Sequence, residues 1–131
     1  MIFADSSFWI GLIDELDDNH AQAARLLERS DRHVVTSNHV VGETWTFLRR
    51  RFRHDVANTF LNLVDDTEGL RVEFTTRELE RDAWGWLRRH DERPYSFVDA
   101  TSFALMRHLR IREAFAFDSD FTAAGFVELR A

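Results

Sequence analysis

Two residue types are absent from the chain: none of its 131 residues is cysteine or lysine. Without cysteine the chain has no disulfide, no thiolate metal ligand and no cysteine nucleophile, which fits the reducing cytoplasm. Without lysine it cannot form a Schiff base or hold a nucleotide phosphate through a Walker-type lysine. All 17 basic residues are therefore arginine.

Long apolar runs are also missing. No stretch approaches the roughly 20 apolar residues that a membrane-spanning helix needs. The N-terminus has no basic segment followed by an apolar run, so it lacks the pattern of a signal peptide. We expect a cytoplasmic protein that does not associate with a membrane.

The chain does contain enough apolar sequence for a folded core. Hydrophobic residues make up 44% of the sequence, which is ordinary for a globular protein, and the length predicts a single domain over residues 1–131. The formal net charge is −6, so the surface as a whole does not attract nucleic acid. A nucleic-acid substrate would need a local basic patch or bound metal ions. The acidic balance equally suits a metal site or a basic protein partner.

Strand-like and helical patterns alternate along the chain. Short apolar or alternating segments predict five strands, at Ile2–Ala4, His33–Thr36, Leu70–Phe74, Glu113–Phe117 and Phe126–Leu129. Helical spacing fills the intervals. The first helical pattern begins at Phe8, with Ser6 or Ser7 as its cap, and extends to Leu16. The helix over Ser96–Arg110 is apolar on nearly all sides, which predicts that it is buried. This alternation predicts an α/β protein with a parallel, doubly wound sheet.

Acidic residues stand at the boundaries of these elements. Asp5 follows the first strand and Asp118 follows the fourth, whereas Glu43 and Asp99 lie within apolar helical sequence. Each has an ordinary structural alternative. Asp5 and Asp118 can cap helices, and Asp99 can complete a capping box with Ser96. Glu43 can be an exposed helix residue.

Taken together, the four carboxylates predict a cation site. If the first and fourth strands are neighbours where the strand order reverses, their carboxyl ends meet in one cleft. Carboxylates so close together repel one another unless cations lie between them. Oxygen ligands without histidine or cysteine select Mg²⁺ or Mn²⁺, which can activate water for attack on a phosphodiester. Asp120, two residues after Asp118, is a fifth candidate, either a helix-start residue or an outer ligand.

Other catalytic patterns are missing. The six histidines do not cluster, which argues against zinc, and there is no nucleophile elbow, P-loop or dinucleotide fingerprint. Arginines are dense at Arg49, Arg50, Arg51 and Arg53, with a smaller group at Arg88, Arg89 and Arg93. Either group can bind RNA phosphates or pair with acidic neighbours, and pairing is the ordinary role of a charge run. The spacing of Trp45, Trp84 and Trp86 is typical of core residues.

The motifs together resemble the PIN domain, and more narrowly the VapC-type toxins of bacterial toxin–antitoxin modules. The resemblance covers essentially the whole chain and rests on Phe3-Ala4-Asp5-Ser6-Ser7, the helix that carries Glu43, Ser96-Phe97-Val98-Asp99-Ala100, and Phe117-Asp118-Ser119-Asp120-Phe121 followed by Gly125. It implies a three-layer α/β/α fold. In that fold a parallel sheet of about five strands has the order 3-2-1-4-5, so strands one and four are neighbours.

The resemblance also implies an activity and partners. It implies a Mg²⁺- or Mn²⁺-dependent endoribonuclease that cuts tRNA, rRNA or mRNA, forms a homodimer and is silenced by a small cognate antitoxin. The positions that match the catalytic, metal-binding acids of the family are Asp5, Glu43, Asp99 and Asp118, with Asp120 as a further metal-ligand candidate.

Two other functions fit the sequence in part. A non-catalytic PIN-like module would use the acids only to dock a basic partner, and it would show no ion-dependent cleavage of RNA. A phosphoryl-transfer protein of the receiver kind needs a lysine, and one of the haloacid-dehalogenase kind needs an aspartate where Ser7 stands. Because every core acid is present, the sequence favours the nuclease.

Overall fold

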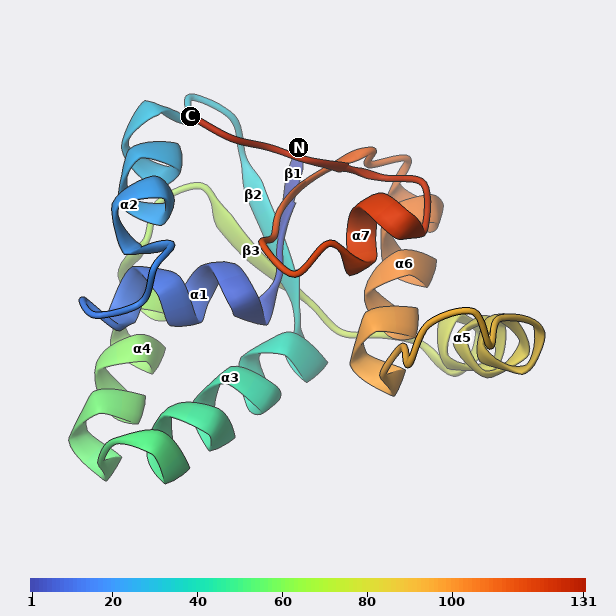
Figure 1. The fold of residues 1–131 in the computed structure, drawn as a ribbon, viewed down its shortest axis with the longest axis horizontal. Coiled ribbons are helices and arrows are strands. Elements are labelled where there is room, and N and C mark those ends of the chain that lie inside the picture. The colour runs from blue at the N-terminus through green and yellow to red at the C-terminus, as the bar shows by residue number, and fades with distance from the viewer.

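A parallel sheet of five strands forms the centre of the molecule (Figure 1). The computed structural model describes residues 1–131. The strands are β1 (Ile2–Ala4), β2 (Val34–Ser37), β3 (Leu70–Glu73), β4 (Glu113–Phe115) and β5 (Val127–Glu128). They lie in the order β3-β2-β1-β4-β5, and every neighbouring pair is parallel. The predicted α/β fold and strand order are confirmed.

Seven helices surround the sheet: α1 (Ser6–Ile13), α2 (His20–Arg29), α3 (Asn38–Arg51), α4 (His54–Asp66), α5 (Arg77–Arg89), α6 (Phe97–Leu109) and α7 (Asp120–Ala123). Figure 1 shows α1, α2 and α4 on one side of the strands and α5, α6 and α7 on the other. Helix α3 contacts both α1 and α6, so it connects the two groups. No helix is both long enough and apolar enough to cross a membrane.

Strand β1 and helix α6 form the centre of the hydrophobic core. All of β1 is buried, and α6 is buried continuously from Ala100 to Met106. A helix enclosed on all sides needs apolar residues around its circumference, as the sequence indicates. Phe103 of α6 packs edge-on against Phe121 of α7, with 5.0 Å between the ring centroids. The core therefore holds α6 and α7 in a fixed relation.

The start and end of α1 differ from the sequence prediction. The helix begins at Ser6 rather than Phe8 because the cap is Asp5, whose side chain accepts a hydrogen bond from the Ser7 amide. Of the caps that the sequence offered, Ser6 or Ser7 was therefore wrong and Asp5 is confirmed. The helix also ends before Leu16, which is 92% exposed. Beyond Ile13 the sequence keeps the spacing of a helix, but the chain forms a turn in which Leu16 is not buried.

The fourth strand is shorter than predicted. β4 ends at Phe115 because the Phe117 amide donates a hydrogen bond to the Ser7 hydroxyl instead of to a neighbouring strand.

Trp86 is buried in the core, as expected, but Trp84 is 50% exposed. Helix α5 buries only one face, and Trp84 lies off that face. Its ring stacks on Phe97, with 4.3 Å between the centroids.

Candidate metal centre

The carboxyl ends of β1 and β4 lie side by side. The two strands pair in parallel with Ala4 opposite Phe115, and the Asp5 amide donates a hydrogen bond of 3.0 Å to the Phe115 carbonyl oxygen. β2 and β4 flank β1 on opposite sides, so the strand order reverses here. In open parallel sheets this is the edge outside which ligands bind.

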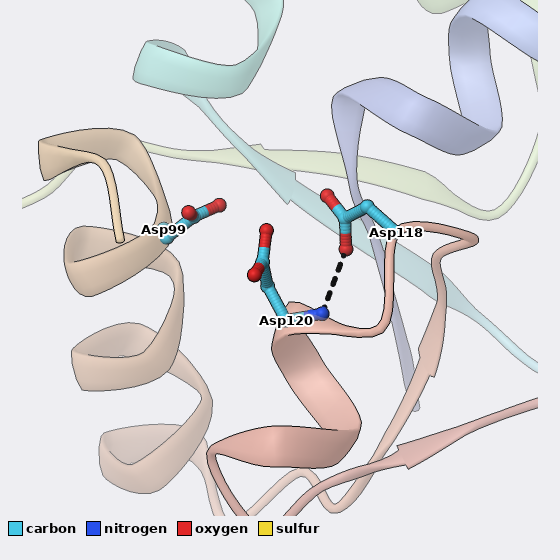
Figure 2. A group of neighbouring side chains, drawn as sticks. All are labelled: Asp99, Asp118 and Asp120. Carbon is cyan, nitrogen blue, oxygen red and sulfur yellow. Dashed lines mark hydrogen bonds between the residues drawn. The ribbon is translucent and has the colours of Figure 1, made fainter. Parts of the chain in front are cut away.

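Three aspartates meet beyond this edge. Asp99 comes from the first turn of α6, Asp118 from the segment after β4, and Asp120 from the first residue of α7. One carboxylate oxygen from each lies within 4.8 Å of the others. Figure 2 shows the three side chains pointing into a common space, with the Asp120 amide donating to Oδ1 of Asp118 at 3.2 Å. Asp120 therefore belongs to the group, and it is also the first residue of α7, as the first of its two interpretations predicted.

Asp5 lies outside this close group but interacts with it electrostatically. The residue is 1% exposed. Burial and, next, the negative charge of Asp118 raise the pKa of Asp5 to about 8, although hydrogen bonds from Ser7 lower it. Burial likewise raises the pKa of Asp118 to about 6, with the charges of Asp120 and Asp99 adding to the effect. Carboxylates that repel one another in this way form a site for positive charge.

Glu43 lies at the rim of the site rather than within the close group. It is on the exposed face of α3. Although the residue as a whole is exposed, its carboxyl group is partly buried, and this burial is the main cause that raises the pKa of Glu43. The charge of Asp99 raises the pKa further, and a hydrogen bond from the Ser6 side chain lowers it. The structure thus brings Glu43 into the electrostatic field of the aspartates without joining it to their cluster.

The capping roles considered for Asp5 and Asp99 are confirmed, whereas the N-cap of α7 is Ser119 rather than Asp118. Oδ2 of Asp5 accepts from the Ser7 amide at 3.2 Å and from the Ser7 hydroxyl at 2.8 Å. Oδ2 of Asp99 accepts from the Ser96 amide at 3.0 Å, which completes a capping box. Oδ1 of each residue has no hydrogen bond within the protein. Each cap therefore fixes one oxygen and leaves the other for a ligand.

Arg93 pairs with an acidic residue, as the sequence favoured for its group, but its place in the site was not predicted. Its Nε and Nη2 atoms donate to Oδ1 of Asp120 at 3.1 and 2.9 Å. The sequence grouped Arg93 with Arg88 and Arg89, but only Arg93 lies in the loop just before α6. Nothing in its spacing from Asp120, 27 residues later, indicates the contact, which exists only because α6 and α7 pack together.

The donors present suit a hard divalent cation. Apart from serine hydroxyls they are all carboxylate oxygens, and no histidine or cysteine joins the cluster, which is the ligand chemistry of Mg²⁺ and Mn²⁺. Arg93 is the one cation paired with the close group. One guanidinium beside three aspartates leaves the group with an excess of negative charge.

The whole chain matches a known family. The family model described as PIN domain matches residues 2–127, and the chain belongs to the PIN domain family. It is 55% identical over 130 residues to the 23S rRNA-specific endonuclease VapC20 of Mycobacterium tuberculosis, covering 99% of this chain and 98% of that protein. It is also similar to the crystal structure of M. tuberculosis VapC20, described as a sarcin–ricin loop cleaving toxin, with a TM-score of 0.95, 52% identity and full coverage of both chains.

Proposed function

We propose that this chain is the endoribonuclease toxin of a type II toxin–antitoxin module and that it hydrolyses the sarcin–ricin loop of 23S rRNA. The observation that carries the proposal is the convergence of Asp99, Asp118 and Asp120 beside the buried Asp5 at the reversal point of the sheet. Full-length similarity to an enzyme named for cutting that RNA supports the substrate.

The acidic residues have different roles in the proposed reaction. When bound, Mg²⁺, or Mn²⁺ in its place, supplies a Lewis acid that activates water and offsets charge on the phosphate. Asp5, Asp99, Asp118 and Asp120 would hold the cation, and Oδ1 of Asp5 and of Asp99 carries no hydrogen bond from the protein. Glu43 stands at the rim, where its carboxylate accepts the proton of the attacking water. One water is consumed for each phosphodiester bond broken.

The proposed partners follow from the same site. A cognate antitoxin silences the toxin by bringing a cationic group to the acidic cluster. The Arg93–Asp120 pair supports this, because it is an example of a guanidinium bound at the cluster. The toxin acts in the cytoplasm, where its RNA substrate is, and as a homodimer like the family it resembles.

Replacement of Asp5 or Asp99 by Asn tests the proposal. Each variant keeps the size and the cap acceptor of the native side chain but loses one negative charge, so we expect cleavage of a sarcin–ricin loop RNA to be abolished while the fold is retained. Asp65→Asn, on the exposed end of α4, is the matched control and should cleave normally. Product formation is followed on denaturing gels with Mg²⁺ and with EDTA.

Two results would contradict the assignment. Cleavage at the native rate by Asp5→Asn would show that the Asp5 carboxylate has no role in the reaction. Absence of any ion-dependent cleavage by the native chain would favour the alternative of a non-catalytic module that uses its acids to dock a basic partner.

A further inference from the structure

A groove leads away from the acidic cluster along α3. It has a volume of about 810 Å³ and extends from Asn38 and His39 at the start of the helix, past Glu43, to Arg50 and Arg51 at its end. His39, Gly42 and Thr46 of the same helix form its floor, and Val98 of α6 lines its side. Because residues three and four apart share one face of a helix, these positions form a continuous stripe. The groove therefore follows one helix and passes the rim of the metal centre at Glu43.

The far end of the groove carries positive charge that the protein does not neutralise. Arg50 and Arg51 are exposed and form no ion pair. Arg51 lies over the ring of Phe52 at 5.7 Å, a contact that leaves its charge in place. Arg53, in contrast, pairs with Asp55. The expectation that this basic run pairs with acidic neighbours is thus correct for Arg53 alone.

The floor of the groove lets a chain approach the helix closely. Gly42 has no side chain, and a Cβ atom added there would meet nothing within 4 Å. No packing requirement of the fold accounts for glycine in this turn of α3. Seven residues separate Glu43 from Arg50, a rise of about 10 Å along the helix. That distance corresponds to roughly three nucleotides at the stacked spacing of about 3.4 Å.

We propose that this α3 groove binds the strand of RNA adjacent to the scissile phosphate, with Arg50 and Arg51 holding backbone phosphates about three nucleotides from the cut. The inference rests on the proposed endoribonuclease function and adds to it the path of the substrate. A chain with a net charge of −6 needs a local basic surface to hold a polyanion. The unneutralised arginines in line with the acidic cluster provide that surface.

Charge removal at the far end of the groove tests the proposal. Arg50→Gln/Arg51→Gln is compared with Arg25→Gln/Arg29→Gln, which removes two exposed charges from α2, away from α3 (Figure 1). Both pairs are made in the Asp5→Asn background. Binding of a labelled sarcin–ricin loop hairpin is measured by fluorescence anisotropy in EDTA over a range of salt concentrations. We expect weaker binding only for the α3 pair, with the salt slope reduced by roughly 1.4, the value for two phosphate contacts on a single strand.

A steric variant separates occupancy of the groove from general electrostatics. Gly42→Trp places a large side chain in the open space on the floor without removing charge. We expect it to keep the native melting temperature and to weaken RNA binding. In the cleaving protein, both α3 variants should raise KM with little change in kcat, because neither position touches the reacting atoms.

The outcomes distinguish this proposal from the proposed function. If the native chain cleaves RNA and the α3 pair binds RNA as tightly as the α2 pair, the groove assignment is wrong and the nuclease stands. If the α3 pair weakens RNA binding but the native chain never cleaves, the groove stands and the nuclease does not. Retained RNA binding together with lost antitoxin binding would overturn the assignment, because the groove would then hold a protein.

Discussion

At the scale of single residues, the carboxyl group of Asp5 has a different environment at each oxygen. Oδ2 caps α1 through the Ser7 amide and hydroxyl, and the Ser7 hydroxyl in turn accepts from the Phe117 amide at 3.0 Å. Oδ1 has no protein partner. These contacts orient the buried carboxyl toward the segment that carries Asp118, so the helix cap also positions the candidate ligand.

Arg93 gives a prediction at the same scale. Replacing it with Gln removes the one cation that pairs with the close aspartate group, so we expect Mn²⁺ to bind several-fold more tightly because the cation no longer competes with the guanidinium. Isothermal titration of the metal-free protein measures the change. Arg88→Gln, on the exposed surface of α5, is the control and should leave the affinity unchanged. Weaker Mn²⁺ binding by Arg93→Gln would instead show that the ion pair holds Asp120 in position.

At the scale of the elements, three acidic residues of the site lie at the starts of helices. Asp5 caps α1, Asp99 is the third residue of α6, and Asp120 begins α7. The N-terminus of a helix carries partial positive charge and free amides, which stabilise a nearby carboxylate. For this reason a capping motif and a metal ligand can occupy the same position in the sequence, and the two interpretations of these aspartates do not exclude each other.

The capping box of α6 should therefore affect both stability and metal binding. Ser96→Ala removes the acceptor for the Asp99 amide and should cost about 1 kcal/mol of unfolding free energy. It should also weaken Mn²⁺ binding modestly, because the first turn that carries Asp99 loses its hydroxyl cap, while the Ser96 amide still donates to Oδ2 of Asp99. Urea unfolding and metal titration measure the two effects.

Thr76 supplies a matched control for that cap. Its hydroxyl caps α5 by accepting from the Leu79 amide at 3.2 Å, and no acid of the site belongs to that motif. Thr76→Ala should lose a similar amount of stability and keep native Mn²⁺ affinity. If Ser96→Ala also kept native affinity, the box would have no part in positioning Asp99.

At the scale of the whole molecule, the metal-free protein should become less stable as the pH rises. Burial, followed by repulsion from Asp118, raises the pKa of Asp5 to about 8, and burial raises that of Asp118 to about 6, from an ordinary value of 3.8. Between about pH 4 and pH 8 the unfolded chain releases protons that the folded chain keeps, so the free energy of unfolding falls. The lowered pKa values of Asp55 and Glu92 act below this range.

Thermal melts in EDTA from pH 5 to pH 8.5 check the prediction. The melting temperature should fall over this range, and Asp5→Asn should reduce the slope. Added Mg²⁺ or Mn²⁺ should raise the melting temperature more at pH 8 than at pH 5.5, because cation binding requires ionised carboxylates. A melting temperature that rises toward pH 8 in EDTA would contradict the unfavourable burial of Asp5.

Much of the fold was predictable from the sequence because local patterns specify it. Short apolar segments alternating with helical ones predicted a parallel sheet, and nearly complete apolar character predicted the buried α6. Element ends were less predictable. Leu16 continues the helical spacing but lies in a turn, and β4 stops early because the Phe117 amide bonds to Ser7, a residue of another element. Such competition between local pattern and tertiary hydrogen bonds is not encoded in spacing.

The amino-acid sequence by itself determined the chemistry available to this protein. It supplies oxygen ligands without thiols or lysines, at strand ends and helix starts, and it resembles the PIN domain along its length. Only the tertiary structure decided which of these groups meet. The parallel pairing of β1 with β4, and the packing of α6 against α7, bring Asp118, Asp99 and Asp120 together and place Arg93 against them. The tertiary structure also decided that Glu43 lies at the rim and that the charges of Arg50 and Arg51 are unpaired. The position of an acid and the pairing of an arginine depend on which neighbours the folded chain brings within a few ångströms.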